Sequence, residues 1–334
     1  MPYFHRVDAP RVLSMGLVAL DVLCIAQEPE RTSFRAGGTA GNVAAILGAL
    51  GWPATLAGPA EESPAYELML NDLTRCGVEY REMHRAAVPV IIEELEHYAR
   101  HSFAFDCPAC GKALPRYHRT YHGDASSWVR DDIHTDVFFA DRLSDEILEL
   151  AQSARRSNAF IVYEPSDPSD APWAPAMLAL ADMVKYSDER ADRLSWLSDG
   201  DHLEIRTKGA AGLQWRWARH KIHQWQSMAS IHVSNVVDTC GAGDWLTSGI
   251  LIGLLERGDT RATWSGVTAM EQVLRRAQQL AAWSCGYAGA RGALYESGPA
   301  VARAIVQHLE TSVMPDPLPE SNAGFSCAAC PMTS

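Results

Sequence analysis

The chain has 334 residues, 47% of them hydrophobic, which is enough to bury the core of one large α/β domain with a small addition, or of two domains. Its formal net charge of −12 disfavours binding to a nucleic-acid backbone, which needs a basic face. No apolar run approaches the length of a membrane span, and the first residues lack the basic-then-apolar order of a secretion signal. We therefore expect a soluble cytoplasmic protein.

Short apolar runs alternate with helix-like segments, the pattern of a parallel sheet covered by helices on both faces. The expected strands are residues 12–20, 54–57, 137–140, 159–163 and 183–185. The expected helices are residues 41–50, 66–75, 144–155, 241–255, 271–287 and 300–309. The segments 90–95, 101–105 and 116–121 alternate as antiparallel strands do. We therefore expect a doubly wound α/β fold with a mostly parallel sheet and a small antiparallel addition.

Two features near the amino terminus are weak when taken alone. The first apolar run ends in Asp21, a residue that is common where a strand simply ends. Gly37 and Gly38 precede a helix-like segment that contains Asn42. Paired glycines before a helix most often form a turn or allow close packing.

The antiparallel segment contains a potential metal site. Cys107 and Cys110 are followed by Gly111, which is the form of a zinc-knuckle turn. A second pair, Cys327 and Cys330, lies beyond the last expected helix. The four thiolates suffice for tetrahedral zinc if the tail folds back onto this segment of its own or of a partner subunit. A redox disulfide or two free pairs are the alternatives.

Other cysteines and the histidines are less informative. Single cysteines among apolar residues are expected to be buried small hydrophobes; they are Cys24, Cys76, Cys240 and Cys285. For the histidines of the antiparallel segment, surface or strand-face positions are the simpler interpretation, and substrate contact or zinc ligation is the alternative. These are His97, His101, His118 and His122.

Two later segments each allow two interpretations. Glu164 follows the strand expected at residues 159–163, where it is either a capping acid or a contact for magnesium or water. Thr207 to Gly212 connect the apolar residues 203–205 to residues 213–217, so by themselves they form a hairpin connection.

The segment Asp238-Thr-Cys-Gly-Ala-Gly-Asp244 is the most informative in the chain. Its two glycines precede an apolar helix-like run, where backbone N–H groups and the helix dipole would hold an anion. Asp244 could accept the proton of a substrate hydroxyl as that oxygen attacks a phosphate. The alternative is a turn with an aspartate cap. An acid beside an anion site suggests phosphoryl transfer.

Residues 238–244 and 37–44 together resemble the carboxy-terminal and amino-terminal signatures of the ribokinase, or PfkB, family of sugar and nucleoside kinases. The resemblance covers roughly residues 11–309. It implies a ribokinase-like fold for residues 1–314, with a β lid at approximately residues 22–36 and 88–122. Residues 315–334 would then form a separate tail that carries the second cysteine pair.

The resemblance also implies roles for the matching positions. Asp244 is the expected catalytic base, and Gly241, Ala242 and Gly243 are expected to form the anion hole. The expected substrate contacts are Asp21, Gly37, Gly38, Asn42, His122 and Asp124. The expected contacts to the nucleotide and magnesium are Glu164, Ser187, Thr207, Lys208, Gly209, Gly212 and Asp238.

Two positions depart from the family pattern. The family's Asn-x-x-Glu motif matches residues 187–190, where Arg190 replaces the Glu, so Asp188 or Glu189 would have to take over the role in magnesium binding. Glu164 lies where many relatives have an Asp-x-Asn-x-Arg pattern, and the Arg is missing.

We therefore expect an ATP-dependent kinase that phosphorylates a hydroxyl of a sugar or sugar-like small molecule. The expected cofactors are ATP, Mg²⁺ and a structural Zn²⁺, with a monovalent cation as a further candidate. The expected partners are a small-molecule substrate and a second copy of the chain bound through the lid, and neither nucleic acid nor membrane. The alternatives are a nucleoside kinase, or a catalytically weak or inactive regulatory or scaffold protein that binds a ligand on the kinase fold.

Overall fold

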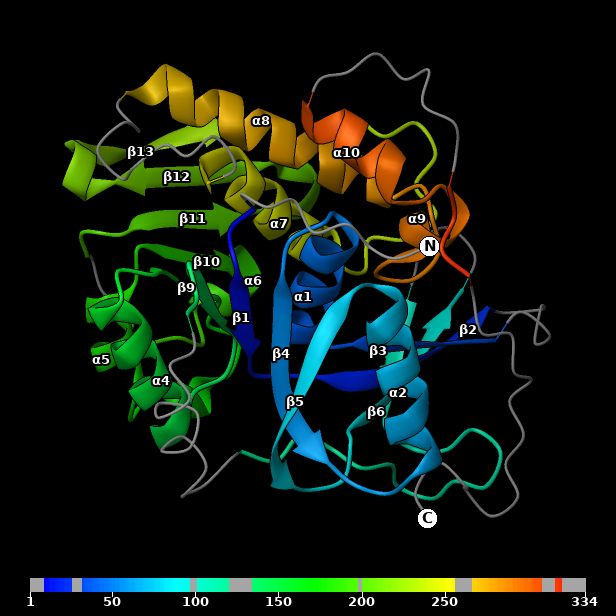
Figure 1. Cartoon of the computed structure of the whole chain (residues 1–334). Coiled ribbons are helices and arrows are strands. Elements are labelled where there is room, and N and C mark those ends of the chain that lie inside the picture. Colours follow the sequence, from blue (N-terminus) through cyan, green and yellow to red (C-terminus); the bar gives the residue numbers. More distant parts are fainter. Residues whose placement is uncertain are drawn as a thin grey trace.

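A nine-stranded sheet forms the centre of the computed structural model, which describes residues 9–25, 32–96, 101–119, 134–197, 200–255, 266–307 and 316–319 (Figure 1). The strand order is β13-β12-β11-β10-β9-β8-β1-β4-β5. All neighbouring strands are parallel except for the pairs β11 with β12 and β12 with β13. The strands are β1 Val12–Met15, β4 Ala54–Ala60, β5 Val78–Arg85, β8 Val137–Ala140, β9 Phe160–Tyr163, β10 Met183–Ser187, β11 Leu203–Thr207, β12 Leu213–Trp217 and β13 Ile222–Met228.

Helices cover both faces of this sheet, because successive strand residues point to opposite sides. Phe139 belongs to the core on the face covered by α1, α2, α7 and α8, whereas Phe138 belongs to the core with α4 and α5. The helices are α1 Thr39–Ala49, α2 Pro64–Arg75, α4 Asp145–Arg156, α5 Ala174–Leu180, α6 Asp188–Ala191, α7 Ala242–Leu255, α8 Val267–Ser284, α9 Gly292–Glu296 and α10 Pro299–Gln307. The doubly wound α/β fold is thus confirmed.

A second sheet of four strands, in the order β3-β2-β6-β7, lies in the segments expected to form the lid and is named the lid for that reason (Figure 1). The pairs β2/β3 and β6/β7 are antiparallel, and β2/β6 is parallel. Residues 116–119 lie outside any strand, so the strand expected at 116–121 is wrong for its described part. The strands of this sheet are β2 Ala19–Ile25, β3 Ser33–Gly37, β6 Val90–Leu95 and β7 His101–Ala104.

The first apolar run is divided between the two sheets, which corrects the single strand expected over residues 12–20. The backbone turns at Gly16, where φ is +130° and a Cβ would lie 2.0 Å from Oδ1 of Asp141. Oδ1 of Asp141 accepts a hydrogen bond from the Leu17 amide (2.8 Å), which fixes the turn. Asp21 is consequently a residue of the lid strand β2 and not the end of β1.

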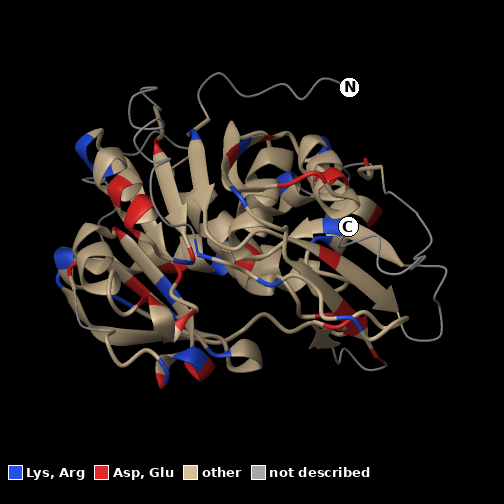
Figure 2. Cartoon of the chain, turned by 90° about the horizontal axis from the view of Figure 1, so that it is seen from below, with Lys and Arg blue, Asp and Glu red and all other residues tan. Residues whose placement is uncertain are grey.

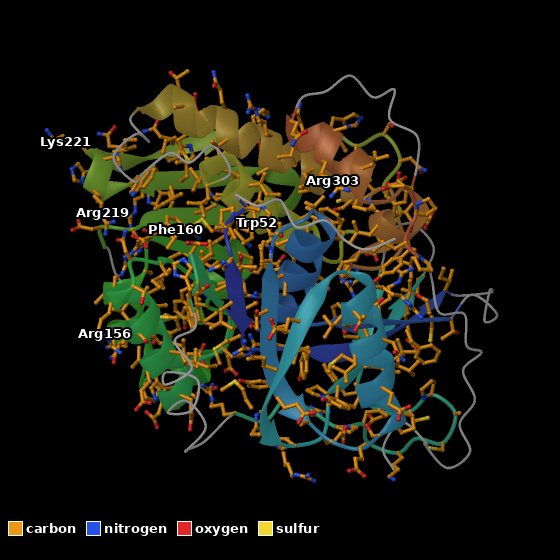
Figure 3. All side chains as sticks on the ribbon, in the orientation of Figure 1. Trp52, Arg156, Phe160, Arg219, Lys221 and Arg303 are labelled. Carbon is orange, nitrogen blue, oxygen red and sulfur yellow. The ribbon has the colours of Figure 1, made fainter. Side chains whose placement is uncertain are left out.

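The carboxyl end of α1 is anchored in the interior of the molecule. Figure 3 labels Trp52, which is fully buried just after this helix, and Arg303 on α10. The Arg303 guanidinium donates a hydrogen bond to the Ala49 carbonyl (3.3 Å). This contact provides a partner for one of the carbonyls that a helix end leaves unpaired.

Acidic and basic residues are interspersed over the molecule in the view of Figure 2. Several form local pairs, such as Arg155 with Asp182 (2.8 Å) and Arg216 with Glu204 (2.5 Å). Among the described residues, no helix has both the length and the apolar composition needed to cross a membrane.

Candidate active site

The loop before α7 is held in place by a buried aspartate. Oδ1 of Asp238 accepts the Cys240 amide (2.9 Å), and Oδ2 accepts the Gly289 amide (2.8 Å). Gly241 follows with φ of +71°, and a Cβ at this position would lie 2.5 Å from the carbonyl oxygen of Ala290. A side chain is therefore excluded at this turn for both conformational and steric reasons.

The amides of this loop differ in their availability. The amide of Ala242 donates to the carbonyl of Thr239 (3.3 Å), and that of Asp244 donates to the carbonyl of Gly241 (2.9 Å). The amides of Gly241 and Gly243 have no acceptor within the described part of the chain. Because they lie at the positive end of α7, these two amides are available to an anion.

Asp244 lies in the first turn of α7 and is 9% exposed. Its Oδ2 accepts a hydrogen bond from Nδ2 of Asn42 on α1 (2.8 Å). Burial is the main cause that raises its pKa to about 8, and the neighbouring Glu164 charge adds to this, while Lys185 and Asn42 act in the opposite direction. A carboxyl group with such a pKa can exchange a proton near neutral pH.

A charge pair lies beside Asp244. Nζ of Lys185 on β10 lies 2.8 Å from Oε2 of Glu164, and both side chains are nearly buried. The Thr247 hydroxyl, on α7, donates to Oε1 of the same carboxylate. Glu164 thus contacts the centre of the site, and its partner Lys185 was not expected from the sequence. A lysine within a short apolar strand is the signal that could have identified it.

The two glycines before α1 allow a close approach to Asp21. A Cβ on Gly37 would lie 1.8 Å from Oδ2 of Asp21, and Gly38 has φ of +76°. Burial raises the Asp21 pKa to about 6, although Arg291 and a hydrogen bond from the Gly38 backbone lower it. A small cavity of about 10 Å³ lies here, and its polar lining is supplied by Asp21, Arg35, Asn42, Glu93 and Arg291.

A buried ion pair lies beneath this cavity. Nη2 of Arg291 is 2.6 Å from Oδ2 of Asp72, and each side chain is 1% exposed. Asp72 also accepts hydrogen bonds from the Tyr295 hydroxyl (2.7 Å) and the Ala36 amide (2.9 Å). Nε of Arg291 donates to Oδ1 of Asn42 (3.1 Å), so the Nδ2 group of Asn42 is directed at Asp244. No sequence motif indicated this network.

The sequence profile of the pfkB family carbohydrate kinases matches residues 10–296. The chain belongs to this family. It is therefore a carbohydrate kinase, a phosphotransferase with an alcohol group as acceptor. None of the curated proteins compared with the chain matches it.

Solved structures of kinases share the fold at low identity. A fructokinase from Xylella fastidiosa with bound ATP is 19% identical, with a TM-score of 0.66 over 90% of this chain and 97% of its own. An aminoimidazole riboside kinase from Salmonella enterica, complexed with aminoimidazole riboside and an ATP analogue, is 19% identical, with a TM-score of 0.62 over 89% and 99%. A fructokinase double mutant from Vibrio cholerae, bound to fructose, ADP and potassium, is 18% identical, with a TM-score of 0.63 over 86% and 96%.

The hairpin from Thr207 to Gly212 lies at the carboxyl end of β11 in this pfkB kinase. Thr207 and Ser187 are register partners at the carboxyl ends of β11 and β10. The Lys208 amide donates to the Gly212 carbonyl (2.8 Å), and Gly209 lies within the turn. The expected hairpin is confirmed.

A cavity lies next to the end of β13. The Ser230 hydroxyl donates to the Ala210 carbonyl (2.7 Å), which connects the turn to the segment after β13. The cavity lies between this segment and α8, and its lining includes Met228, Ala229, Glu271 and Arg275.

The Asn-x-x-Glu position of the family contains a different ion pair in this kinase. Asp188, at the start of α6, pairs with Arg206 on β11. Arg190 is exposed at the end of the same short helix. Of the acids that were expected to contact magnesium, Glu164 is the one that lies next to Asp244.

The cysteine turn of the lid is described, but other expected residues are not. The Cys107 amide donates to the Lys112 carbonyl (2.8 Å), and the Gly111 amide to the Cys107 carbonyl (2.8 Å). Gly111 has φ of +70°, as a tight knuckle turn requires, and the Cys107 side chain is buried whereas Cys110 is exposed. The candidate residues outside the described part are His97, His122, Asp124, Cys327 and Cys330.

Proposed function

We propose that this kinase transfers the terminal phosphoryl group of ATP to a hydroxyl of a sugar or sugar-like molecule, with Asp244 as the base. The observation that carries this proposal is the 2.8 Å hydrogen bond from Asn42 to Asp244. It joins the base to the cavity that Asp21 and Asn42 line. A hydroxyl held there could transfer its proton to Asp244 as it attacks phosphorus.

The anion hole in this proposal consists of the Gly241 and Gly243 amides at the amino end of α7. These donors are fixed before the reaction, so they can stabilise charge on the transferred group without reorganisation. Magnesium, when bound to the nucleotide, supplies positive charge that offsets the charge of the phosphates. The Glu164 carboxylate fits a contact to this ion through water, because it lies beside the base and carries the required oxygen donors.

The nucleotide fits at the carboxyl ends of the strands β10 and β11. In this proposal Ser187, Thr207 to Gly212 and Asp238 border the phosphates of the nucleotide. Its adenine ring occupies the cavity between Ala229 and α8. Arg275 lines that cavity and adds positive charge. A monovalent cation is a further expected cofactor, as a potassium ion is present in the fructokinase from Vibrio cholerae.

The thiolates of Cys107, Cys110, Cys327 and Cys330 fit a structural zinc ion that connects the lid to the tail. The preformed turn at Gly111 supports this part of the proposal. Such a clamp would restrict lid motion or fix a homodimer, and it requires a reducing compartment such as the cytoplasm. Metal analysis of reduced protein, with and without the Cys327 and Cys330 pair, tests it, and a metal-free wild-type preparation would reject it.

A catalytically weak protein that binds a ligand on the same fold is the second candidate. Arg190 favours it, since a guanidinium stands where relatives have a carboxylate for magnesium. Asp188, an acid that could have replaced the missing magnesium ligand, is already paired with Arg206.

ATP turnover across a panel of sugars, sugar acids, polyols and nucleosides distinguishes these functions. In the kinase, Asp244→Asn should lower kcat by about 10² to 10⁴-fold, because this is the usual contribution of a general base. Glu149→Gln, an exposed change on α4, is the matched control and should retain wild-type turnover. Substrate-induced thermal stabilisation without turnover on any compound would favour the scaffold, and full activity of Asp244→Asn would reject the assigned base.

A further inference from the structure

Two acids and a histidine meet where the lid contacts the loop before α7. One ligand atom from each of Glu93, His101 and Asp238 lies within 4.8 Å of the others. On the lid, Glu93 pairs with Phe103 and Leu95 with His101, so Glu93 and His101 are diagonal neighbours on one face of the β6/β7 pair. The shared face directs both side chains toward Asp238.

Glu93 contacts Asp238 and Cys240, but one of its two buried carboxylate oxygens has no partner among the described residues. Glu93 is 2% exposed, and the oxygen without a hydrogen-bond partner in this part of the chain is Oε1. Burial and, to a smaller extent, the charge of Asp238 together raise its pKa to about 9. A buried carboxylate without a counter-ion is costly, and a cation at this point would remove the cost for both acids.

The other two residues are already oriented as ligands. Each carboxylate oxygen of Asp238 accepts one backbone amide, from Cys240 or from Gly289. Fixed outer contacts of this kind are typical of carboxylates that bind metals. Nδ1 of half-buried His101 lies 3.1 Å from Oδ1 of Asp238, close to the separation of about 3.3 Å between two ligands of one ion at bond lengths near 2.0 Å.

We propose that Glu93, His101 and Asp238 bind one divalent transition-metal ion that fastens the lid to the anion-hole loop. Two carboxylates and one imidazole suit Mn²⁺, Co²⁺ or Zn²⁺, and the site is separate from the thiolates of Cys107 and Cys110. Two of its ligands come from the lid and the third from the loop that contains Gly241. Metal binding would therefore hold the lid closed over the cavity that Glu93 also lines.

Mn²⁺ titration of the full-length protein without nucleotide, followed by electron paramagnetic resonance, tests the site. We expect one Mn²⁺ per chain, with binding at least about tenfold weaker in Glu93→Gln and His101→Gln, since even the loss of a ligand's outer partner has an effect of this size. His134→Gln changes an exposed histidine that also lies near an aspartate, Asp136, and should bind as the wild type does. Replacement of all four paired cysteines by serine should also leave Mn²⁺ binding unchanged.

Three outcomes would overturn the proposal. They are no bound Mn²⁺ in the wild type, equal binding by the Glu93→Gln and wild-type proteins, or loss of the ion in the cysteine variant. In the first two cases Glu93 instead stays protonated against Asp238. Circular dichroism verifies folding of each variant, and His101→Gln keeps the test decisive if Glu93→Gln fails to fold, because His101 is partly exposed.

Discussion

Asp72 and Asp244 occupy the two ends of one buried polar network and have different surroundings. Asp72 accepts three hydrogen bonds, including one from the guanidinium of Arg291. Asp244 accepts one from neutral Asn42 and lies beside the charge of Glu164. Arg291 therefore neutralises one acid directly and orients Asn42 toward the other. A matched buried charge supports the fold, while an incompletely matched one remains able to take up a proton.

Removal of Arg291, the counter-ion of Asp72, should have the largest effect on stability. Arg291→Met leaves Asp72 buried without its cation, which should lower the free energy of unfolding by about 3–5 kcal/mol. Urea denaturation measures the change. Arg303→Met, which removes a single hydrogen bond to the Ala49 carbonyl, is the control and should lose about 1 kcal/mol. Equal losses of unfolding free energy in the two variants would show that the Arg291–Asp72 ion pair contributes no more than a single hydrogen bond.

Asp244, which has no direct counter-ion, should make the free energy of unfolding depend on pH. The Asp244 pKa is raised from 3.8 to about 8, so the folded protein retains a proton that the unfolded chain releases. The stability that this retained proton contributes is fully present below about pH 4, and it is lost as the pH rises through about 8. Asp244→Asn does not titrate, so the wild type should lose up to about 1.4 kcal/mol per pH unit relative to it between pH 5 and 7. Parallel urea-derived stability curves for the two proteins would contradict the raised pKa.

Loss of the lysine near Asp244 should change activity with a smaller effect. Lys185→Met removes a positive charge, so the Asp244 pKa should rise and less of the base should be ionised at neutral pH. We expect kcat/KM at pH 7 to fall about tenfold, with its rising limb displaced by about one pH unit to higher pH. Lys221→Met, at an exposed turn labelled in Figure 3, is the control and should leave the profile unchanged. A uniform fall in kcat/KM without displacement would indicate a purely structural role for Lys185.

Motif residues of the site could be predicted from the sequence, but their supporting contacts could not. Asn42 and Asp244 are 202 positions apart, and each belongs to a glycine-rich signature that marks the start of a helix. Lys185 was assigned only as part of a strand; a lysine within a short apolar strand is an unusual signal, but it does not show which partner the side chain meets. Arg291 stands among alanines and glycines, and nothing local indicates that it pairs with Asp72, 219 positions away.

Many of the strands and helices followed from the alternation of apolar runs, whereas β5, β13 and α5 were not expected and some boundaries differ. Residues 12–20 form one continuous apolar run, yet Gly16 turns the backbone so that its halves enter different sheets. The turn depends on Asp141, which lies far along the chain, and periodicity describes only local sequence.

The division of residues 12–20 at Gly16 has a consequence for the affinity of the protein for its acceptor alcohol. Asp21 is attached to β2, so a displacement of the lid sheet would withdraw it from the cavity that contains Asn42. Under the proposed function, closure of the lid and binding of the acceptor alcohol would therefore be coupled. The apparent dissociation constant for that alcohol would increase in inverse proportion to the fraction of molecules that are closed. Substitutions far from the cavity that favour the open arrangement would consequently weaken binding without removing a contact.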